Sequence, residues 1–237
     1  MSESLSLSSY AARRGEIETY FDRTAADAWA KLTSDAKVSG VRATVRAGRD
    51  AMRKTLLFWM PADLSGARIL DAGCGAGQLA IEAARRGADV VAVDVAGTLV
   101  NLARERAANE TFAGSIDFRT GDMLDPALGA FDYVVAMDSL IHYDAADIVR
   151  VLAGLAPRTR SAVLFTFAPK TAALSAMHAA GKLFPKGDRA PSIRPAAEAR
   201  LRRIISEAPT LKGWTGARTK KISSGFYTSQ AMELRPQ

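Results

Sequence analysis

Short apolar runs alternate with longer amphipathic segments through the middle of the chain, beginning near residue 67. Such runs, rich in Val, Ile, Ala and Phe, are typical of buried parallel strands. The runs that we expect to form strands cover residues 68–71, 89–94, 116–120, 133–137 and 162–167. Segments rich in Ala, Leu and Arg separate them and predict helices over residues 78–86, 98–109 and 145–155. This alternation indicates an α/β fold in which helices cover both faces of a parallel sheet.

The first sixty residues differ from this middle region, because they contain no strand pattern. We expect residues 1–60 to form a helical arm or cap on a main domain that covers residues 61–237. Between Val41 and Trp59, apolar residues recur at helical spacing, and four basic residues do the same. These are Arg42, Arg46, Arg49 and Arg53. One face of the predicted helix is therefore basic, and we interpret it as exposed to solvent rather than as a docking surface.

The last seventy residues also break the alternation. Residues 171–184 predict an amphipathic helix, and the prolines that follow predict an irregular connection to a second helix at 196–206. Residues 217–223 and 225–234 then predict an antiparallel hairpin that closes the sheet. The whole chain thus predicts a doubly wound, Rossmann-like sheet with a helical N-terminal arm and a lid inserted at about residues 170–210.

The composition is that of a globular protein with a full core, since 48% of the residues are apolar and 24% are charged. Every apolar run is shorter than the roughly 18 residues that span a bilayer, so we expect no transmembrane segment. The N-terminus is Ser-rich and has no basic and apolar leader pattern, which argues against secretion. The only cysteine, Cys74, cannot form an internal disulfide or a cysteine-based metal site. These features favour a cytoplasmic protein.

Charge is distributed unevenly along the chain, although the net charge is only +7. Residues 61–167 carry nine basic and fourteen acidic side chains, whereas residues 168–237 carry thirteen and four. The basic part could meet an anionic substrate or partner, or it could be an ordinary solvated surface. The charge pattern leaves both interpretations open.

A glycine-rich segment ends the first predicted strand and precedes the first predicted helix of the sheet. Gly73, Gly75 and Gly77 follow the spacing G-x-G-x-G, and Gln78 stands where a dinucleotide-binding fingerprint has Gly or Ala. Loops without Cβ atoms let a ligand approach backbone N–H groups at a helix N-terminus. Asp71, just before the loop, would repel a pyrophosphate but attract an ammonium or sulfonium cation. The loop therefore favours a cationic cofactor over a dinucleotide.

Two more acidic residues stand at predicted strand ends. Asp94 ends the second strand, 21 positions after the first glycine of the loop, where a carboxylate can accept hydrogen bonds from both ribose hydroxyls. Asp122 follows the third strand and can accept from an adenine amino group, with Met123 packing against the ring. Each aspartate alone is also consistent with a helix cap or a turn. Together with the glycine spacing they predict an adenosyl cofactor site, to which we also assign Val95 and Met137.

At these residues the chain resembles the class I S-adenosylmethionine-dependent methyltransferases, over about residues 66–167. The resemblance implies S-adenosylmethionine as the co-substrate and a seven-stranded sheet whose last two strands form a reversed hairpin. Residues 136–143 lack the Asn/Asp-Pro-Pro-aromatic motif of enzymes that methylate base amines, and Cys74 lies within the loop rather than beyond it. His142 and His178 lack metal-ligand spacing. Methylation of a small molecule is therefore the remaining interpretation. We expect no metal site in the protein.

Three further segments resemble a single family over nearly the whole chain, the magnesium-protoporphyrin O-methyltransferases of chlorophyll and bacteriochlorophyll synthesis. They are residues 131–143, residues 20–22 with Trp29, and residues 177–185. The resemblance implies methyl transfer from S-adenosylmethionine to a propionate carboxylate of Mg-protoporphyrin IX, which gives the monomethyl ester. Magnesium then belongs to the substrate. The resemblance also implies delivery of the porphyrin by the large subunit of magnesium chelatase, and we consider a peripheral location at the photosynthetic membrane.

The same resemblance carries catalytic roles to His142 and Tyr20. We expect both to position the acceptor and close the site, and His142 to accept a proton if the acid enters protonated. A propionic acid has a pKa of roughly 4.3, so it is already anionic at neutral pH and needs no strong base. We further expect residues 171–206 to form a basic lid over the porphyrin. Its cations would be Lys170, Lys182, Lys186, Arg189 and Arg194.

Other classes of function stay open. The chain could be a non-catalytic S-adenosylmethionine-binding module, since a fold and a cofactor do not prove turnover. It could methylate another anionic small molecule, or RNA, because the basic C-terminal part would suit phosphates. Only three aromatic residues follow Phe184, however, and they form no clear base-stacking platform. We therefore expect no nucleic-acid partner.

Overall fold

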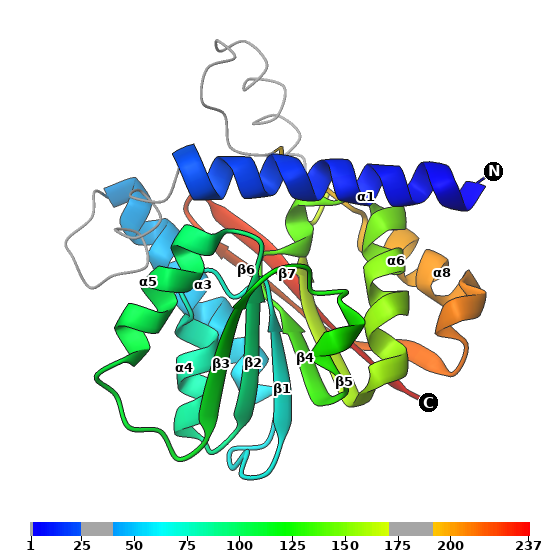
Figure 1. The fold of residues 1–237 in the computed structure, drawn as a ribbon. Helices are drawn as coiled ribbons and strands as arrows, with labels where there is room; N and C mark the ends of the chain where they lie inside the picture. The colour runs from blue at the N-terminus through cyan, green and yellow to red at the C-terminus, as the bar shows by residue number, and fades with distance from the viewer. Residues whose placement is uncertain (1, 25–39, 171–191) are drawn as a thin grey trace.

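The computed structural model describes residues 2–24, 40–170 and 192–237, and its centre is a seven-stranded sheet (Figure 1). The strands are β1 (Arg68–Ala72), β2 (Asp89–Asp94), β3 (Ser115–Thr120), β4 (Phe131–Ala136), β5 (Thr159–Phe167), β6 (Trp214–Ser224) and β7 (Tyr227–Pro236). Their order in the sheet is β3-β2-β1-β4-β5-β7-β6. Strands β1 to β5 are parallel, and β7 is antiparallel to both of its neighbours. This arrangement confirms the doubly wound sheet with its reversed hairpin.

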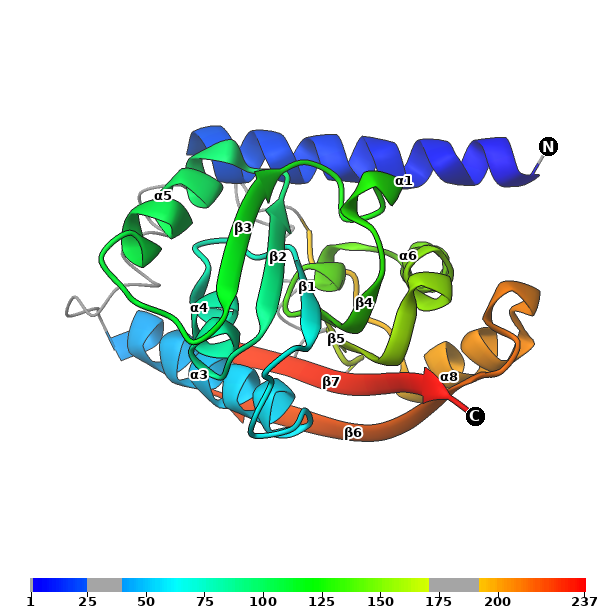
Figure 2. The same cartoon turned by 60° about the horizontal axis from the view of Figure 1, so that its bottom comes forward.

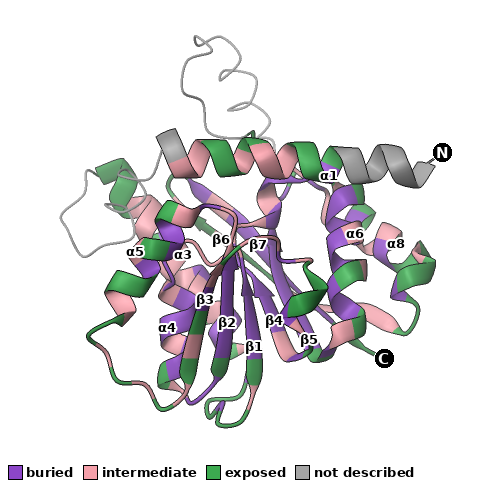
Figure 3. Cartoon of the chain, viewed as in Figure 1, coloured by how far each residue is buried: buried purple, intermediate pink, exposed green. Residues whose placement is uncertain are grey.

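Helices cover the two faces of the sheet and close a separate apolar core on each. Helices α3 (Gly40–Phe58), α4 (Gln78–Arg85) and α5 (Gly97–Ala107) pack on one face. Helices α6 (Ala145–Leu155) and α8 (Glu198–Glu207) pack on the other. Short 3-10 turns connect some elements: η2 (Pro126–Leu128), η3 (Leu140–His142), η4 (Ala156–Arg158) and η5 (Pro209–Leu211). The central strands are buried almost throughout because both of their faces are covered (Figure 3).

The N-terminal helix α1 (Ser2–Thr19) crosses the carboxyl ends of the parallel strands and continues into a π-helical turn, η1 (Tyr20–Thr24) (Figure 2). One contact from the middle of α1 and one from η1 hold this segment against other helices. The hydroxyl of Ser9 donates to Asp147 of α6 at 2.9 Å, and the backbone N–H of Thr98 in α5 donates to Asp22 Oδ1 at 2.7 Å. Helix α1, the first part of the expected helical arm, therefore lies over the edge of the sheet that carries the predicted site residues.

Helix α3 packs into the core rather than outside it. Met52, Leu56 and Leu57 have no exposed surface, and a Cβ atom at Gly48 would lie 2.3 Å from Tyr227 Cδ1, so this helix approaches β7 closely. The interpretation of its basic face as solvent-exposed is wrong for two of the four arginines. The side chains of Arg49 and Arg53 are only 16% and 12% exposed, because both turn inward to acidic partners.

Several predicted boundaries, including those of β4 and β5, shift by one to three residues, and two of the shifts have identifiable reasons. Helix α8 begins at Glu198 rather than at 196, because Ala196 pairs with Pro169 in an isolated parallel bridge. Strand β6 begins at Trp214 rather than at 217, and its register is irregular after Gly216. There the Arg202 guanidinium donates to the carbonyls of residues 216 and 217, which no local sequence pattern indicates. The helix expected over 171–184, and most of the expected lid, lie outside the described residues.

Candidate active site

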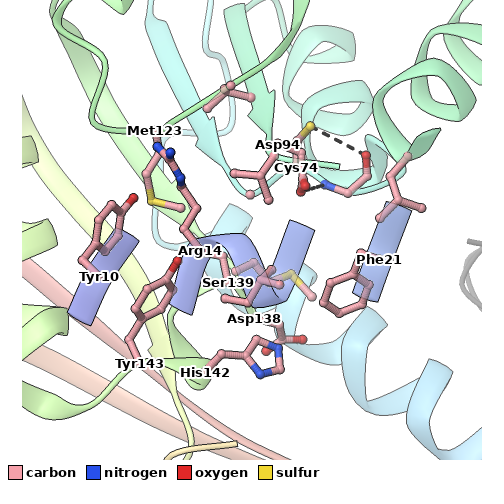
Figure 4. Close-up of a pocket in the computed structure, with 18 of the residues that line it drawn as sticks. Tyr10, Arg14, Phe21, Cys74, Asp94, Met123, Asp138, Ser139, His142 and Tyr143 are labelled. Carbon is pink, nitrogen blue, oxygen red and sulfur yellow. Dashed lines mark hydrogen bonds between the residues drawn. The ribbon is translucent and has the colours of Figure 1, made fainter. Parts of the chain in front are cut away.

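A cavity with about 700 Å³ of empty space opens at the carboxyl ends of β1, β2 and β4 (Figure 4). The strand ends form its floor, and Tyr10, Arg14 and Ile17 of α1 line its other side. Seven predicted site residues line this cavity: Gly73, Gly75, Asp94, Val95, Met123, Met137 and His142. Asp71 lines a smaller cavity that adjoins it. The carboxyl ends of parallel strands thus bring together most of the residues that the sequence singles out, as expected for a ligand site in an open α/β sheet.

The glycine loop connects β1 to α4 with a backbone that other residues rarely adopt. Gly73, Gly75 and Gly77 all have positive φ angles, of 85°, 51° and 77°. At Gly73 a Cβ atom would lie 2.4 Å from Ser139 Cβ, so the loop passes close to the end of β4. Gly77 is buried against Ala103 and does not line the cavity. The first two glycines therefore expose backbone to a ligand, whereas the third lets the loop pack.

Asp94 fixes the position of this loop. Its Oδ2 accepts the backbone N–H of Gly75 at 2.8 Å, and its Oδ1 accepts the N–H of Ala96 at 2.9 Å. Burial raises the pKa of Asp94, while these two N–H groups oppose the shift. A carboxylate oxygen can accept more than one hydrogen bond. Asp94 can therefore hold the loop and still accept from ribose hydroxyls, the role predicted for it.

Asp71 lies deeper than any other acidic residue of the predicted site. The residue is 2% exposed, and its Oδ2 accepts no hydrogen bond from the described residues. Burial is the main cause that raises its pKa to about 7, and the nearby Asp94 carboxylate adds to the shift. An unsatisfied buried acceptor is costly, so this atom suits a ligand that brings a donor or a cation.

Asp122 differs from the other two aspartates because α1 already contacts it. The hydroxyl of Tyr10 donates to Asp122 Oδ1 at 2.7 Å, and the guanidinium of Arg14 bonds Oδ2. The backbone N–H of Leu124 donates at 2.9 Å. Burial raises the pKa of Tyr10 well above its usual range, so the phenol stays protonated and remains a donor. The role of Asp122 toward an adenine stays a prediction, and the sequence did not indicate this contact with α1.

His142 lies in the turn after β4 and is 7% exposed. The ring of Phe21 meets it edge-on, with centroids 6.1 Å apart, and both residues line the cavity. Tyr20 does not line the described cavity, and its ring packs edge-on against Phe21 at 5.0 Å. The structure therefore brings Phe21 directly to His142, with Tyr20 one ring further away. The catalytic roles of His142 and Tyr20 stay predictions.

Sequence reasoning missed a buried ion pair at the end of β4. Asp138 has a φ angle of 54°, the only positive φ among the described residues other than glycine, and its side chain is 4% exposed. Arg49 of α3 donates to its Oδ2 at 2.8 Å, and both residues line the cavity. The regular spacing of arginines in α3 was the available signal for Arg49. The partner could not be inferred, because it lies 89 positions away.

These residues fit S-adenosylmethionine. The orphaned Oδ2 of Asp71 suits the ammonium group of the methionine part, and Asp94 suits the ribose. Met123 and Met137 offer soft apolar surface along the cavity. Among the described residues there is no group of three or more His, Cys, Asp or Glu side chains arranged to hold a metal ion. Within the same part of the chain, no helix is both long and apolar enough to span a membrane.

Comparisons with known proteins agree with this geometry. Residues 136–236 match a family model described as the magnesium-protoporphyrin IX methyltransferase C-terminus, and residues 69–161 match a methyltransferase domain model. A magnesium-protoporphyrin O-methyltransferase from Rhodobacter capsulatus is 51% identical over 97% of this chain and 99% of its own length. The enzyme of the same name from Synechocystis is 30% identical over 92% of this chain and 94% of its own.

Solved structures give the same result. The crystal structure of magnesium protoporphyrin IX methyltransferase from Synechocystis with bound SAH superposes with a TM-score of 0.81 at 29% identity. It covers 93% of this chain and 98% of the other. The same protein with bound SAM gives a TM-score of 0.77. With the near full-length likeness to the Rhodobacter protein, these findings show that the chain belongs to the magnesium-protoporphyrin O-methyltransferase family.

Proposed function

We propose that this chain transfers the methyl group of S-adenosylmethionine to a propionate carboxylate of Mg-protoporphyrin IX and so forms the monomethyl ester. The observation that carries the proposal is the 51% identity to a protein of that activity along 97% of the chain. The cavity supports it independently, because its carboxylates and glycine loop suit a cationic adenosyl co-substrate. Bound S-adenosylmethionine supplies an electrophilic methyl group on a sulfonium centre.

The acceptor chemistry makes modest demands on the protein. A propionate has a pKa of roughly 4.3 and is an anionic nucleophile at neutral pH. The residues around the cavity must therefore orient it and exclude water rather than remove a proton. His142 and Phe21 lie together at the cavity wall, and Tyr20 packs behind Phe21. We assign this cluster to holding the acceptor, with His142 able to accept a proton from an acid that enters protonated.

Turnover with defined acceptors tests the proposal. The purified chain is incubated with S-adenosylmethionine and one of three acceptors: Mg-protoporphyrin IX, metal-free protoporphyrin IX or a transcribed RNA. We expect a porphyrin monomethyl ester, formed fastest from the magnesium porphyrin, and no methylated RNA. An Asp71→Asn variant that folds is the control for activity of this site. Binding of S-adenosylmethionine without turnover of any porphyrin would instead support a non-catalytic module.

Two expectations about partners also become proposals. We infer that the large subunit of magnesium chelatase delivers the porphyrin, and that the chain associates peripherally with the photosynthetic membrane. Supporting the second point, Val41 and Phe226 are 52% and 60% exposed, and Arg42, Lys220 and Lys221 are exposed on the same helix and hairpin. Sedimentation with anionic vesicles tests the membrane proposal, and Phe226→Ser should reduce the bound fraction. Co-sedimentation of the chain with the large subunit of magnesium chelatase, in the absence of lipid, tests whether the two proteins bind each other.

A further inference from the structure

The N-terminal helix supplies one wall of the large cavity, and this wall contains a cation. Four of its residues line the cavity at steps of four, three and four positions, which places them on one face of the helix (Figure 4). They are Tyr10, Arg14, Ile17 and Phe21. Three of the four are apolar or aromatic, and Arg14 carries the charge. A large, flat acceptor that enters the cavity therefore meets an apolar surface and one guanidinium.

The charge of Arg14 is only loosely engaged by the protein. Its guanidinium bonds Oδ2 of Asp122, and the two side chains are 37% and 22% exposed. An ion pair this open to solvent contributes little to stability. Asp122 keeps the hydroxyl of Tyr10 and the backbone N–H of Leu124 as donors when Arg14 turns away, and the adenine amino group that we assign to Asp122 adds another. Arg14 can therefore exchange Asp122 for a different anion.

Arg49 cannot make this exchange. In the described part of the chain, Arg14 and Arg49 are the arginines that line the cavity, and no lysine does. The side chain of Arg49 is 16% exposed and pairs with Asp138, whose side chain is 4% exposed. Moving this guanidinium away would leave a buried carboxylate without its cation, which is strongly unfavourable. Arg14 is therefore the better placed of the two to bind an anionic acceptor.

The acceptor of the proposed reaction has two carboxylates, on propionate groups of neighbouring pyrrole rings. One oxygen of the reacting propionate bonds the methyl carbon while the carbon–sulfur bond breaks, and the electron pair of that bond stays on sulfur. The positive sulfonium centre attracts this propionate. The other propionate stays an anion throughout, and it requires a cation of the protein when it leaves water.

Arg14 lies at a suitable distance for this second propionate. Seven residues separate it from Phe21, whose ring meets His142, and seven residues span about 10 Å along a helix. We place the reacting propionate beside Phe21 and His142. The flexible arm on the neighbouring pyrrole can then extend along the apolar face of α1 toward Arg14.

On the basis of the proposed function, we propose that Arg14 binds the propionate that does not react, and that it thereby limits the chain to one methyl transfer per porphyrin. The monomethyl ester can present its remaining acid to S-adenosylmethionine only after turning over, which places the methyl ester at Arg14. An ester carries no charge, so this orientation loses the ion pair. Arg14 is therefore a specificity-determining residue that contacts the acceptor away from the reacting atoms.

The test compares two acceptors that differ by one methyl group, Mg-protoporphyrin IX and its purified monomethyl ester. We expect kcat/KM of the wild-type chain to favour the diacid at least tenfold. Arg14→Met should lower this ratio to about two, the ratio of free acids in the two acceptors, mainly by raising KM for the diacid. Arg13→Met is the matched control and should keep the wild-type ratio, because Arg13 pairs with Glu16 at 2.6 Å and does not line the cavity. A ratio unchanged in Arg14→Met, or lost in Arg13→Met, would overturn the proposal.

Further measurements separate specificity from folding. A structural defect of α1 slows both acceptors equally and leaves their ratio unchanged, whereas Arg14→Lys keeps the charge and should keep most of the ratio. Asp122→Asn removes the anion that holds Arg14, so without co-substrate it should bind the diacid several-fold more tightly in absorbance titrations, and adding Arg14→Met should cancel this gain. An equal gain for the dimethyl ester would contradict the exchange.

The outcomes also distinguish this inference from the proposed function. If the wild-type chain methylates neither porphyrin, the proposed function fails. If it methylates the diacid and the monomethyl ester with equal kcat/KM, the proposed function holds and the role of Arg14 is wrong.

Discussion

The two ends of the cavity hold their carboxylates in opposite ways. At the end that we propose for the methionine part, called the methionine end below, Asp71 is buried, and its Oδ2 accepts nothing from the described residues. At the end that we propose for the adenine, called the adenine end below, Asp122 accepts from Tyr10, Arg14 and the backbone of Leu124. Asp71 Oδ2 thus has no donor in the described part of the chain, whereas Asp122 already has three, two of which belong to the N-terminal helix.

This difference indicates where binding free energy arises. A ligand that satisfies a buried, unpaired acceptor gains a charge-assisted bond and removes an existing penalty. A ligand that reaches Asp122 must share or exchange hydrogen bonds that the protein makes by itself. We therefore expect substitutions to have their largest effect on affinity at Asp71 and their smallest at Asp122.

The largest effect is expected for Asp71→Asn. The amide has the shape of the carboxyl group but carries no charge for the ammonium group, so the affinity for S-adenosylmethionine should fall by about 100-fold, or about 2.7 kcal/mol. Calorimetric titration measures it. Asp89→Asn, an exposed aspartate at the opposite end of β2, is the control and should bind normally. A loss below threefold would mean that the orphaned oxygen does not face the ligand.

Asp94→Ala should come next. It removes the acceptor expected for the ribose hydroxyls, at a cost on the order of 1.5–3 kcal/mol for both S-adenosylmethionine and S-adenosylhomocysteine. The same change frees the N–H of Gly75, so thermal unfolding of the ligand-free chain should also shift downward. Wild-type affinity in this variant would remove Asp94 from the site.

The unusual pKa of Asp71 gives a prediction about pH. Its value of about 7 in the fold exceeds the ordinary value of 3.8, so between these limits the folded chain holds a proton that the unfolded chain has released. The contribution of Asp71 to the free energy of unfolding therefore falls as pH rises from 4 to 7, by on the order of 4 kcal/mol. Urea unfolding of the ligand-free chain should show Asp71→Asn gaining stability over wild type across this interval. Parallel pH profiles would contradict it.

The fold could be predicted from the sequence because its signals are local. Each parallel strand is a short apolar run, and Asp71, Asp94 and Met123 each stand at or just beyond the end of one. Parallel strands then place those ends at one edge of the sheet, so residues scattered along the chain meet without any further information.

The rest of the site depends on contacts between distant elements, which no local pattern encodes. Arg49 lies 89 positions before Asp138 in the sequence and Tyr227 lies 89 positions after it, yet both bond its carboxylate. The spacing of the α3 arginines predicts a helix face, but not that two of them turn inward. Likewise nothing near Tyr10 or Arg14 shows that α1 would reach Asp122, 112 and 108 positions away.

A smaller effect, on turnover, is expected where we place the acceptor. There the side chains of Tyr20, Phe21 and His142 contact one another through their rings rather than through ion pairs. His142→Ala should lower turnover by about tenfold while leaving S-adenosylhomocysteine affinity unchanged, because orientation and not base strength is lost. Phe21→Leu should lower it by several-fold and Tyr20→Phe by less, since Phe21 lies between Tyr20 and the histidine. Complete loss of turnover in a folded His142→Ala variant would instead indicate obligatory base catalysis.

The smallest effect on affinity is expected at Asp122. A change at its partner Arg14 should alter the rate at which S-adenosylmethionine associates more than the dissociation constant. Arg14 holds α1 over the adenine end, but its side chain is 37% exposed, so its ion pair contributes at most about 1 kcal/mol. Arg14→Ala should therefore speed association of S-adenosylmethionine by up to about fivefold in stopped-flow fluorescence, with the dissociation constant changed by less than threefold. Arg13→Ala is the matched control, because Arg13 pairs only with Glu16 among the described acidic residues of this helix. Equal rates in the two variants would show that α1 does not obstruct the adenine end. A large loss of affinity in Arg14→Ala would show that the arginine itself contacts the ligand, and the contrast with Asp71 would then be weaker than the geometry suggests.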